Sequence, residues 1–143
     1  MKKRQELIKD WMTKDVVVVS PDTTVPEAHR IMTEKSIRRL PVVDGKKLVG
    51  IVTRGDVRGA EPSDATTLSI WELNYLLAKL KLSEIMTRNP LTITPDATVM
   101  EAAQLMLDNK ISGLPVLDAE GIVVGIVTES DIFRMVASAW RVD

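Results

Sequence analysis

One pattern of apolar and polar positions occurs twice along this chain. A short apolar segment opens each copy, at residues 16–19 and again at 91–93. Pro-Asp then turns the chain, and apolar residues follow at the three- and four-residue spacing of a helix. Two short apolar strands joined by a glycine-containing turn come next, and a second helix ends the copy. Each copy therefore predicts the element order β-α-β-β-α and an α+β fold.

Direct alignment supports an internal duplication. Residues 11–44 align with 85–118 without a gap, and 14 of the 34 positions are identical. Residues 50–57 align with 125–132, and 5 of these 8 positions are identical. Unrelated segments of ordinary composition match at roughly 6% of positions. The sequence predicts a first repeat with an N-terminal helix over 1–60, a helical linker over 61–82 and a second repeat over 83–143.

Capping boxes predict where three of the helices begin. In this motif a Ser or Thr oxygen accepts a backbone N–H, and a Glu three residues later reaches back to the cap. The pairs are Thr24 with Glu27, Ser69 with Glu72 and Thr98 with Glu101. The linker helix, predicted from Ser69 through Lys81, carries leucines along one face. We expect this face to pack on the body of the protein or on a partner.

Composition excludes several classes of protein. The net charge of −1 is unlike the basic excess of nucleic-acid-binding proteins. The chain has no cysteine and one histidine, His29, so thiolate and multi-histidine metal sites are excluded. No apolar run approaches the roughly 20 residues that span a bilayer, and no apolar signal segment follows the basic N-terminus. We expect a cytoplasmic protein with no nucleic-acid or membrane partner and no metal site.

The strongest functional motif closes each repeat. It reads Gly-Ile-Val-Thr-Arg-Gly-Asp at residues 50–56 and Gly-Ile-Val-Thr-Glu-Ser-Asp at 125–131. Thr-x-x-Asp is itself a capping box, which is a purely structural explanation. The functional interpretation is that the first helical turn offers N–H groups to a phosphate, while the aspartate accepts ribose hydroxyls. The two interpretations are compatible, because the threonine can cap while the aspartate faces a ligand.

A second motif precedes the first strand of each hairpin. It reads Ser-Ile-Arg-Arg-Leu-Pro-Val at residues 36–42 and Lys-Ile-Ser-Gly-Leu-Pro-Val at 110–116. A proline just inside a strand indicates a sheet edge or a strand entry, so we expect the preceding backbone groups to be free to meet a base edge. Arg38 and Arg39 have no basic counterpart in the second copy. They are either solvated side chains or a clamp for phosphate.

Together these motifs resemble the CBS domain family over nearly the whole chain. The resemblance rests on the paired G-h-V-T-x-x-D ends, the h-P-V strands and the M-T…P-D-x-T-V openings. The linker is similar to that of stand-alone CBS pairs, including acetoin-utilisation-type proteins. The resemblance implies two repeats packed with pseudo-twofold symmetry and two clefts between them. Family members bind AMP, ADP, ATP or S-adenosylmethionine in these clefts.

The resemblance also implies two sets of ligand-binding residues. The Asp56 set comprises Thr53, Gly55, Asp56, Thr87, Thr92, Ile111, Ser112 and Gly113. The Asp131 set comprises Thr128, Ser130, Asp131, Thr13, Val18, Ile37, Arg38 and Arg39. The aspartates would hold ribose, Thr53 and Thr128 ribose or phosphate, and the Ile37 and Ile111 regions adenine. Gly55 departs from Ser130 by lacking a hydroxyl, so we expect tighter nucleotide binding by the Asp131 set.

The sequence thus predicts a regulatory sensor with an adenine nucleotide or S-adenosylmethionine as its ligand and without a catalytic cofactor. The alternative is an oligomerisation scaffold, or a regulatory partner without a tightly bound ligand. Catalysis needs an acid–base pair or an activated nucleophile, and the motifs supply neither. We further expect a homodimer formed through the helices near Ala28–Lys35, Ala102–Asn109 and Asp131–Trp140. An enzyme or a transporter would be the regulated target.

Overall fold

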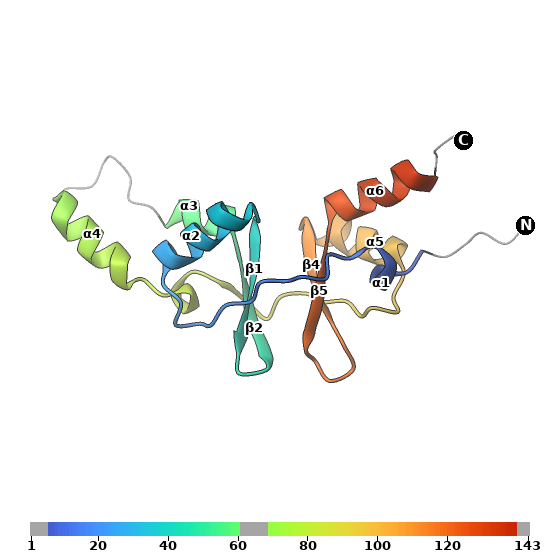
Figure 1. Ribbon diagram of the computed structural model, residues 1–143, viewed down its shortest axis with the longest axis horizontal. Helices are drawn as coiled ribbons and strands as arrows, with labels where there is room; N and C mark the ends of the chain where they lie inside the picture. The colour runs from blue at the N-terminus through green and yellow to red at the C-terminus, as the bar shows by residue number, and fades with distance from the viewer. Residues whose placement is uncertain (1–5, 61–68, 140–143) are drawn as a thin grey trace, which may run out of the picture. The chain divides into compact units, whose positions relative to one another are not determined.

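The computed structural model describes residues 6–60 and 69–139 (Figure 1). Contacts divide the chain into two compact units. The first-repeat unit is Val17–Pro90, and the second-repeat unit joins Met1–Val16 to Leu91–Asp143. The two repeats of mixed helix and strand are those expected from the sequence.

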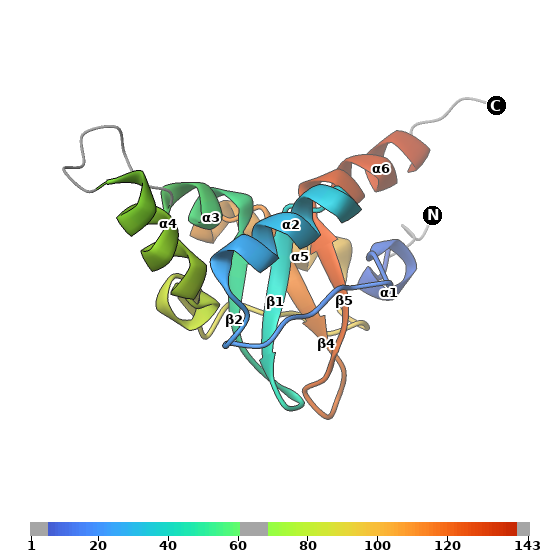
Figure 2. The ribbon, with the colours of Figure 1, turned by 60° about the vertical axis from the view of Figure 1, so that its left-hand side comes forward.

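The first-repeat unit is built around an antiparallel hairpin. Its strands, β1 (Arg39–Asp44) and β2 (Lys47–Thr53), turn at Gly45, whose φ of 64° is left-handed. A short strand, β3 (Thr87–Arg88), pairs with the other edge of β2. Helices α2 (Val25–Lys35) and α3 (Arg54–Gly59) contact the hairpin, as Figure 2 shows. Helix α4 (Ile70–Lys79) contacts α2, and the one-turn helix η1 (Leu82–Glu84) follows it.

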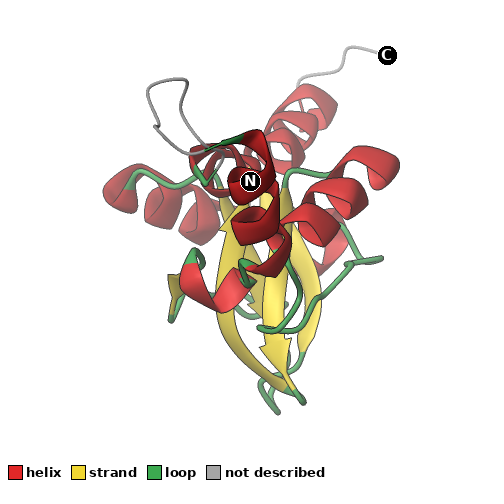
Figure 3. Cartoon of the chain, turned by 90° about the vertical axis from the view of Figure 1, so that its left-hand side faces the viewer, coloured by secondary structure: helices red, strands yellow, loops and turns green. Residues whose placement is uncertain are grey.

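The second-repeat unit repeats this plan. Strands β4 (Gly113–Leu117) and β5 (Val123–Thr128) form its hairpin. The strands of both units are yellow in Figure 3. Helices α5 (Val99–Asn109) and α6 (Glu129–Ala139) contact these strands and each other. The short helix α1 (Ile8–Trp11), near the N-terminus, packs on α5, α6 and β5. Thus the N-terminal helix expected from the sequence is present and completes the second-repeat unit.

The opening segments of the repeats are exchanged between the units. Thr13, at the start of the first repeat, bridges to Ile126 in β5, and their backbones exchange two hydrogen bonds of 2.8 and 3.0 Å. Thr87, at the equivalent place in the second repeat, pairs with Ile51 in β2. Each hairpin therefore gains a neighbour from the segment that opens the other repeat.

The apolar strands predicted at 16–19 and 91–93 are less regular than expected. Each makes an isolated parallel bridge to the first strand of its hairpin, Val19 to Val42 and Ile93 to Val116. Successive hydrogen bonds flank each bridge, for example Val19 N to Pro41 O at 3.0 Å and Val43 N to Val19 O at 2.8 Å. The proline that follows each segment, Pro21 or Pro95, turns the chain away before a longer ladder can form.

The predicted capping boxes of Ser69 with Glu72 and Thr98 with Glu101 are confirmed in both directions. At Thr24 only half of the prediction holds. Thr24 Oγ1 accepts from Glu27 N at 3.3 Å, but the Glu27 carboxylate binds the guanidinium of Arg30 instead of reaching back. A charged partner one turn ahead competes with the neutral N–H of the cap.

Helix α4 ends at Lys79, two residues earlier than the sequence pattern predicts. Leu80 leaves the helical conformation with φ −71° and ψ 122°. Its backbone instead accepts a hydrogen bond of 2.8 Å from Val25 N. The first turn of α2 thereby fixes the end of α4.

Each unit has its own apolar core. Leu40, Val42 and Val52 are fully buried in the first-repeat unit, as are Leu114 and Val116 in the second. Ile8 and Leu82, which occupy equivalent places in the two repeats, are also fully buried, each in the unit of the other repeat. Among the described residues, no helix is long and apolar enough to cross a membrane.

Candidate functional site

The two sequence motifs of each repeat meet at one end of its hairpin. Arg39 in β1 pairs with Thr53, the last residue of β2, and Gly113 pairs with Thr128 in the same way. The first residue of the following helix closes this end. Arg54 N donates to Arg38 O at 2.8 Å, and Glu129 N donates to Ser112 O at 3.1 Å. The aspartate motif therefore lies beside the Ile-Arg-Arg or Ile-Ser-Gly segment of its own repeat.

Asp56 completes a reciprocal capping box at the start of α3. Its Oδ2 accepts from Thr53 N at 2.9 Å, and its own N–H donates to Thr53 Oγ1 at 3.1 Å. The side chain is half-buried. In the hydrogen bonds described for this unit, Oδ1 of Asp56 has no donor. Asp56 thus caps the helix through one oxygen, while its other oxygen has no donor among the described residues.

Asp131 is bound differently at the start of α6. Its Oδ2 accepts from Thr128 N at 2.8 Å and lies 3.2 Å from Thr128 Oγ1, which donates its hydroxyl. Its Oδ1 accepts from the guanidinium of Arg134, one helical turn ahead. The Asp131 side chain is only 1% exposed, whereas the Arg134 side chain is 64% exposed. Both carboxylate oxygens of Asp131 are therefore engaged within the unit.

Backbone groups that we expected to be free near the hairpin ends are partly used. Ser36 and Lys110 end their helices in the left-handed conformation, with φ of 53° and 54°. This turn directs Ile37 N to Met32 O and Ile111 N to Met106 O, at 3.0 and 3.1 Å. The carbonyls of Arg38 and Ser112 accept from the next helix, as described above. The expectation of free backbone groups was therefore wrong at these atoms. The N–H groups of Ile37 and Ile111 bind the end of the preceding helix, and the carbonyls of Arg38 and Ser112 bind the start of the following helix.

The side chains of Ile37 and Ile111 are half-buried and pack against the cores of their own units. Arg38 is exposed and Arg39 is half-buried. Gly55 and Ser130 occupy equivalent exposed positions at the second residue of α3 and α6. A Cβ on Gly55 would meet Thr53 Oγ1 at an ordinary 3.6 Å, so a serine fits there.

The structure places the predicted ligand-binding residues in two groups, one in each unit. The first-repeat unit holds Val18, Ile37, Arg38, Arg39, Thr53, Gly55, Asp56 and Thr87. The second-repeat unit holds Thr13, Thr92, Ile111, Ser112, Gly113, Thr128, Ser130 and Asp131. Arg39 and Gly113 pair with the last residues of β2 and β5, and Thr87 and Thr13 pair two residues before these ends. The pairing of residues from different repeats, which the family resemblance implies, stays a prediction.

Sequence reasoning missed why each motif begins with glycine. A Cβ on Gly50 would lie 2.5 Å from Met86 Sδ, and a Cβ on Gly125 would lie 2.5 Å from Met12 Sδ. These methionines belong to the Met-Thr pairs that open the repeats. The repeated Met-Thr and Gly-Ile-Val-Thr motifs were the available signal, because they are the two partners of one contact.

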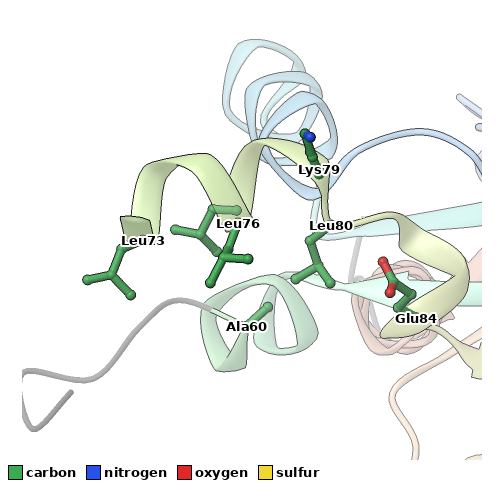
Figure 4. A pocket seen from close by; sticks show the side chains of 7 residues that line it. Ala60, Leu73, Leu76, Lys79, Leu80 and Glu84 are labelled. Atoms are coloured by element: carbon green, nitrogen blue, oxygen red, sulfur yellow. The ribbon is translucent and has the colours of Figure 1, made fainter. Parts of the chain in front are cut away.

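Two of the hollows in the described part of the chain are a groove along α4 and a smaller space between α2 and α3. A groove of about 380 Å³ is lined by Ala60, Leu73, Leu76, Leu77, Lys79, Leu80 and Glu84, and contains none of the predicted ligand-binding residues (Figure 4). A smaller hollow of about 130 Å³ lies between α2 and α3 and includes His29, Arg54 and Arg58. Over 6–60 and 69–139, no group of three or more His, Cys, Asp or Glu side chains is arranged to hold a metal ion.

Comparison with known proteins gives the repeats a family. The family model of the CBS domain matches residues 8–63 and 82–138. An inosine-5'-monophosphate dehydrogenase from Korarchaeum cryptofilum is 39% identical over 133 residues, which are 93% of this chain and 25% of that enzyme. The chain thus spans about a quarter of the length of that relative.

Solved structures of CBS pairs match nearly end to end. The CBS domain pair of protein MJ0100, in complex with 5'-methylthioadenosine and S-adenosyl-L-methionine, is 34% identical with a TM-score of 0.79, covering 95% of this chain and 99% of that one. CBSX2 of Arabidopsis thaliana, in complex with AMP, is 31% identical with a TM-score of 0.79 and the same coverage. An acetoin utilization protein (AcuB) from Vibrio cholerae is 30% identical with a TM-score of 0.76, covering 95% of this chain and 93% of that one.

Proposed function

Because this chain belongs to the CBS domain family, we propose that it is a regulatory module that binds an adenine nucleotide or another adenosyl ligand. The candidate ligands are AMP, ADP, ATP and S-adenosylmethionine. In this proposal the module itself catalyses no reaction and acts in the cytoplasm on an enzyme or transporter that carries the regulated activity.

One observation carries the proposal. At one end of each hairpin lies an aspartate whose carboxylate accepts a hydrogen bond from the backbone N–H of a threonine three residues earlier. An aspartate held by a threonine backbone N–H is fixed in orientation, and a carboxylate can accept up to about four hydrogen bonds. Asp56 is thereby suited to the paired hydroxyls of a ribose, and Asp131 becomes suited to them where a ligand displaces Arg134. The complexes of MJ0100 and CBSX2 support the same ligand class, because 5'-methylthioadenosine, S-adenosyl-L-methionine and AMP all contain adenosine.

We assign the ligand contacts to the two residue sets predicted from the sequence. In the Asp56 set, Asp56 binds ribose and Thr53 binds ribose or phosphate. In the Asp131 set, Asp131 and Thr128 take these roles, with Arg38 and Arg39 on the phosphate. Adenine is placed against the backbone that follows Ile37 or Ile111, since the side chains of both isoleucines pack inward.

Isothermal titration calorimetry with AMP, ADP, ATP and S-adenosylmethionine tests the proposal. We expect at least one of these ligands to bind with heat that is lost when Asp56 and Asp131 are both replaced by alanine. The matched control is Asp118→Ala, which removes an aspartate from the β4–β5 turn, where its Oδ1 accepts from the backbone N–H groups of Glu120 and Ile122. Absence of binding by all four ligands would contradict a nucleotide sensor.

We also propose that two copies of the chain associate through α5 and α6. These adjacent helices expose Met100, Leu107, Phe133 and Val136, whose exposed fractions run from 43% to 78%. The equivalent surface of the first repeat is polar, since α2 exposes Arg30 and Glu34 as an ion pair. Of the predicted dimer helices, those of the second repeat therefore offer the more apolar face. Trp140, at the end of that prediction, lies outside the described residues.

A second candidate function is a docking scaffold without a tightly bound ligand. It is favoured by α4, where Trp71, Tyr75 and Leu76 are 82%, 61% and 56% exposed. The leucine-lined groove of Figure 4 lies on the same helix. Trp and Tyr are enriched at protein interfaces, so this face suits a protein partner. Partner binding that persists unchanged in the Asp56→Ala, Asp131→Ala double variant would favour the scaffold.

A further inference from the structure

The two motif aspartates differ in what holds their outer oxygen. Oδ1 of Asp131 accepts from the guanidinium of Arg134, while Oδ1 of Asp56 accepts none of the hydrogen bonds described for its unit. Asp131 is also the one buried charged residue in the described part of the chain. The carboxylate on which the Asp131 set depends is therefore already paired, and that of the Asp56 set is open.

The difference can be counted in acceptor positions. A carboxylate offers about four lone-pair positions. At Asp131 the backbone and hydroxyl of Thr128 take two of them and Arg134 takes a third. At Asp56 the Thr53 backbone takes one, because the Thr53 hydroxyl is an acceptor here and not a donor to the carboxylate. Two ribose hydroxyls can be accommodated at Asp56 without displacing a donor, but not at Asp131.

The origin of the difference is one position in the sequence. Arg134 lies three residues after Asp131, on the same face of the helix. Three residues after Asp56 stands Gly59, which has no side chain to reach back. A Cβ on Gly59 would meet nothing within 4 Å, so the backbone there tolerates the first atom of a side chain.

We propose that Arg134 is a specificity-determining residue that competes with ribose for the Asp131 carboxylate. This inference rests on the proposed function, because it concerns the same adenosyl sites. A ligand without a phosphate, such as adenosine, must displace the guanidinium from the Asp131 carboxylate and therefore binds there weakly. A phosphorylated ligand meets the same competition at its ribose, but its phosphate can accept hydrogen bonds from the displaced guanidinium. The pairing therefore favours phosphorylated ligands over uncharged adenosine at the Asp131 set.

The alternative is that Arg134 and Asp131 form a helix ion pair that does not affect ligand binding. The two explanations predict different effects of salt on the affinity for adenosine. Adenosine is uncharged, so salt does not screen its own attraction to the protein. Salt does screen the exposed Arg134 guanidinium, since the Debye length falls from about 10 Å at 0.1 M to about 3 Å at 1 M. If Arg134 competes with ribose, adenosine binds the Asp131 set more tightly as salt rises.

The test is calorimetric titration of adenosine and AMP into variants with one functional set. In an Asp56→Ala background, only the Asp131 set remains. There, Arg134→Ala should tighten adenosine binding by about two- to fivefold, the size expected for an exposed ion pair. It should also abolish the gain in adenosine affinity at high salt. Arg134→Lys keeps the charge and should bind adenosine as the Arg134 protein does.

The reciprocal change is made on the other set, in an Asp131→Ala background. Gly59→Arg should weaken adenosine binding by Asp56 by a similar factor, while Gly59→Ala, the matched control without a charge, should leave it unchanged. Circular dichroism at the titration temperature checks that each variant is folded. If Asp56→Ala is unfolded, Asp56→Asn replaces it, because its amide oxygen can still accept from Thr53 N.

The outcomes separate this inference from the proposed function. If AMP binds but Arg134→Ala leaves or lowers the affinity for adenosine, the competition is refuted and the nucleotide sensor stands. If adenosine binds the Asp131 set only after Arg134 is replaced, the competition is established. If neither AMP nor adenosine binds any variant, both ideas are overturned.

Discussion

The sulfur of Met12 lies 2.5 Å from the position that a Cβ of Gly125 would occupy, and Met86 stands in the same relation to Gly50. The backbone carbonyl of Thr13 is also close, at 3.0 Å from that Cβ position. Each glycine thus lets the opening segment of the other repeat approach its strand. This contact ties the Met-Thr opening to the strand that ends in the aspartate motif.

We expect Gly125→Ala to destabilise the protein by about 1–3 kcal/mol, because an added methyl group overpacks the contact with Met12 and Thr13. Urea unfolding followed by circular dichroism measures the change. Met12→Ala combined with Gly125→Ala should lose less stability than the sum of the single changes, since the sulfur is then absent. Gly59→Ala is the matched control and should be neutral or stabilising, because its Cβ meets nothing within 4 Å. Equal effects of Gly125→Ala and Gly59→Ala would contradict the packing argument.

Replacing the two aspartates separately tests the sequence-based ranking of the sets for AMP. We expect Asp131→Ala to abolish the tighter phase of AMP binding and Asp56→Ala to leave it nearly intact, because the Asp131 set combines Ser130 with Arg38 and Arg39. Calorimetry resolves the two phases. Gly55→Ser should tighten the weaker phase by up to roughly tenfold, the effect of one added hydrogen bond.

The two arginines can be assigned to one set by the same measurement. Arg39 pairs with Thr53 within the first-repeat unit, whereas the family resemblance assigns it to the Asp131 set. Arg38→Ala with Arg39→Ala should weaken AMP much more than adenosine if the guanidinium groups bind phosphate. This loss of AMP affinity should appear in the Asp56→Ala background, where only the Asp131 set remains. A loss confined to the Asp131→Ala background would show that the arginines serve Asp56.

Ribose recognition predicts discrimination against deoxynucleotides. A motif aspartate that faces a missing hydroxyl loses a charge-assisted hydrogen bond of roughly 1.5–3 kcal/mol. We therefore expect 2'-deoxy-AMP to bind about tenfold to a hundredfold more weakly than AMP. Competition against a bound fluorescent AMP analogue measures the ratio. Equal affinities would show that Asp56 and Asp131 act only as helix caps.

The apolar face of α5 and α6 predicts a dimer that one charge can disrupt. Leu107→Glu places a carboxylate at a side chain that is 74% exposed, and we expect a monomer at micromolar concentration by light scattering. Thr33→Glu, at the equivalent position of the first repeat, is the matched control and should leave a dimer. A wild-type protein that is already monomeric would contradict the proposed association.

Stability should depend on pH through Glu27. The hydrogen bond from Arg30 lowers the pKa of Glu27 below its ordinary 4.5. A lowered folded-state pKa stabilises the protein above the unfolded value, and this contribution is lost as the pH falls through the folded pKa. The difference in unfolding free energy between wild type and Glu27→Gln should therefore shrink as acid is added below 4.5. In an Arg30→Met background, that pH dependence should disappear.

The sequence by itself determined the duplication, the order of elements and the two motifs that each repeat carries. That both motifs of a repeat meet at one hairpin end was shown by the structure. These features depend on local periodicity, on turn residues and on caps within four residues, which are readable along the chain. It also identified Thr53 with Asp56 as a capping box, because both directions of that contact lie within one turn. The family resemblance follows from the same repeated positions.

Only the tertiary structure decided which partner each group takes. Strand pairing joins residues far apart in sequence, so the pairing of Thr13 with Ile126 and of Thr87 with Ile51 could not be read from either repeat alone. Where a side chain has several possible hydrogen-bond partners nearby, its rotamer decides which of them it binds. Glu27 binds Arg30 and not its cap, and Asp131 binds Arg134 in addition to Thr128. The sequence places Arg134 three residues after Asp131 and Gly59 three residues after Asp56, but only the structure showed that the Arg134 side chain binds the Asp131 carboxylate.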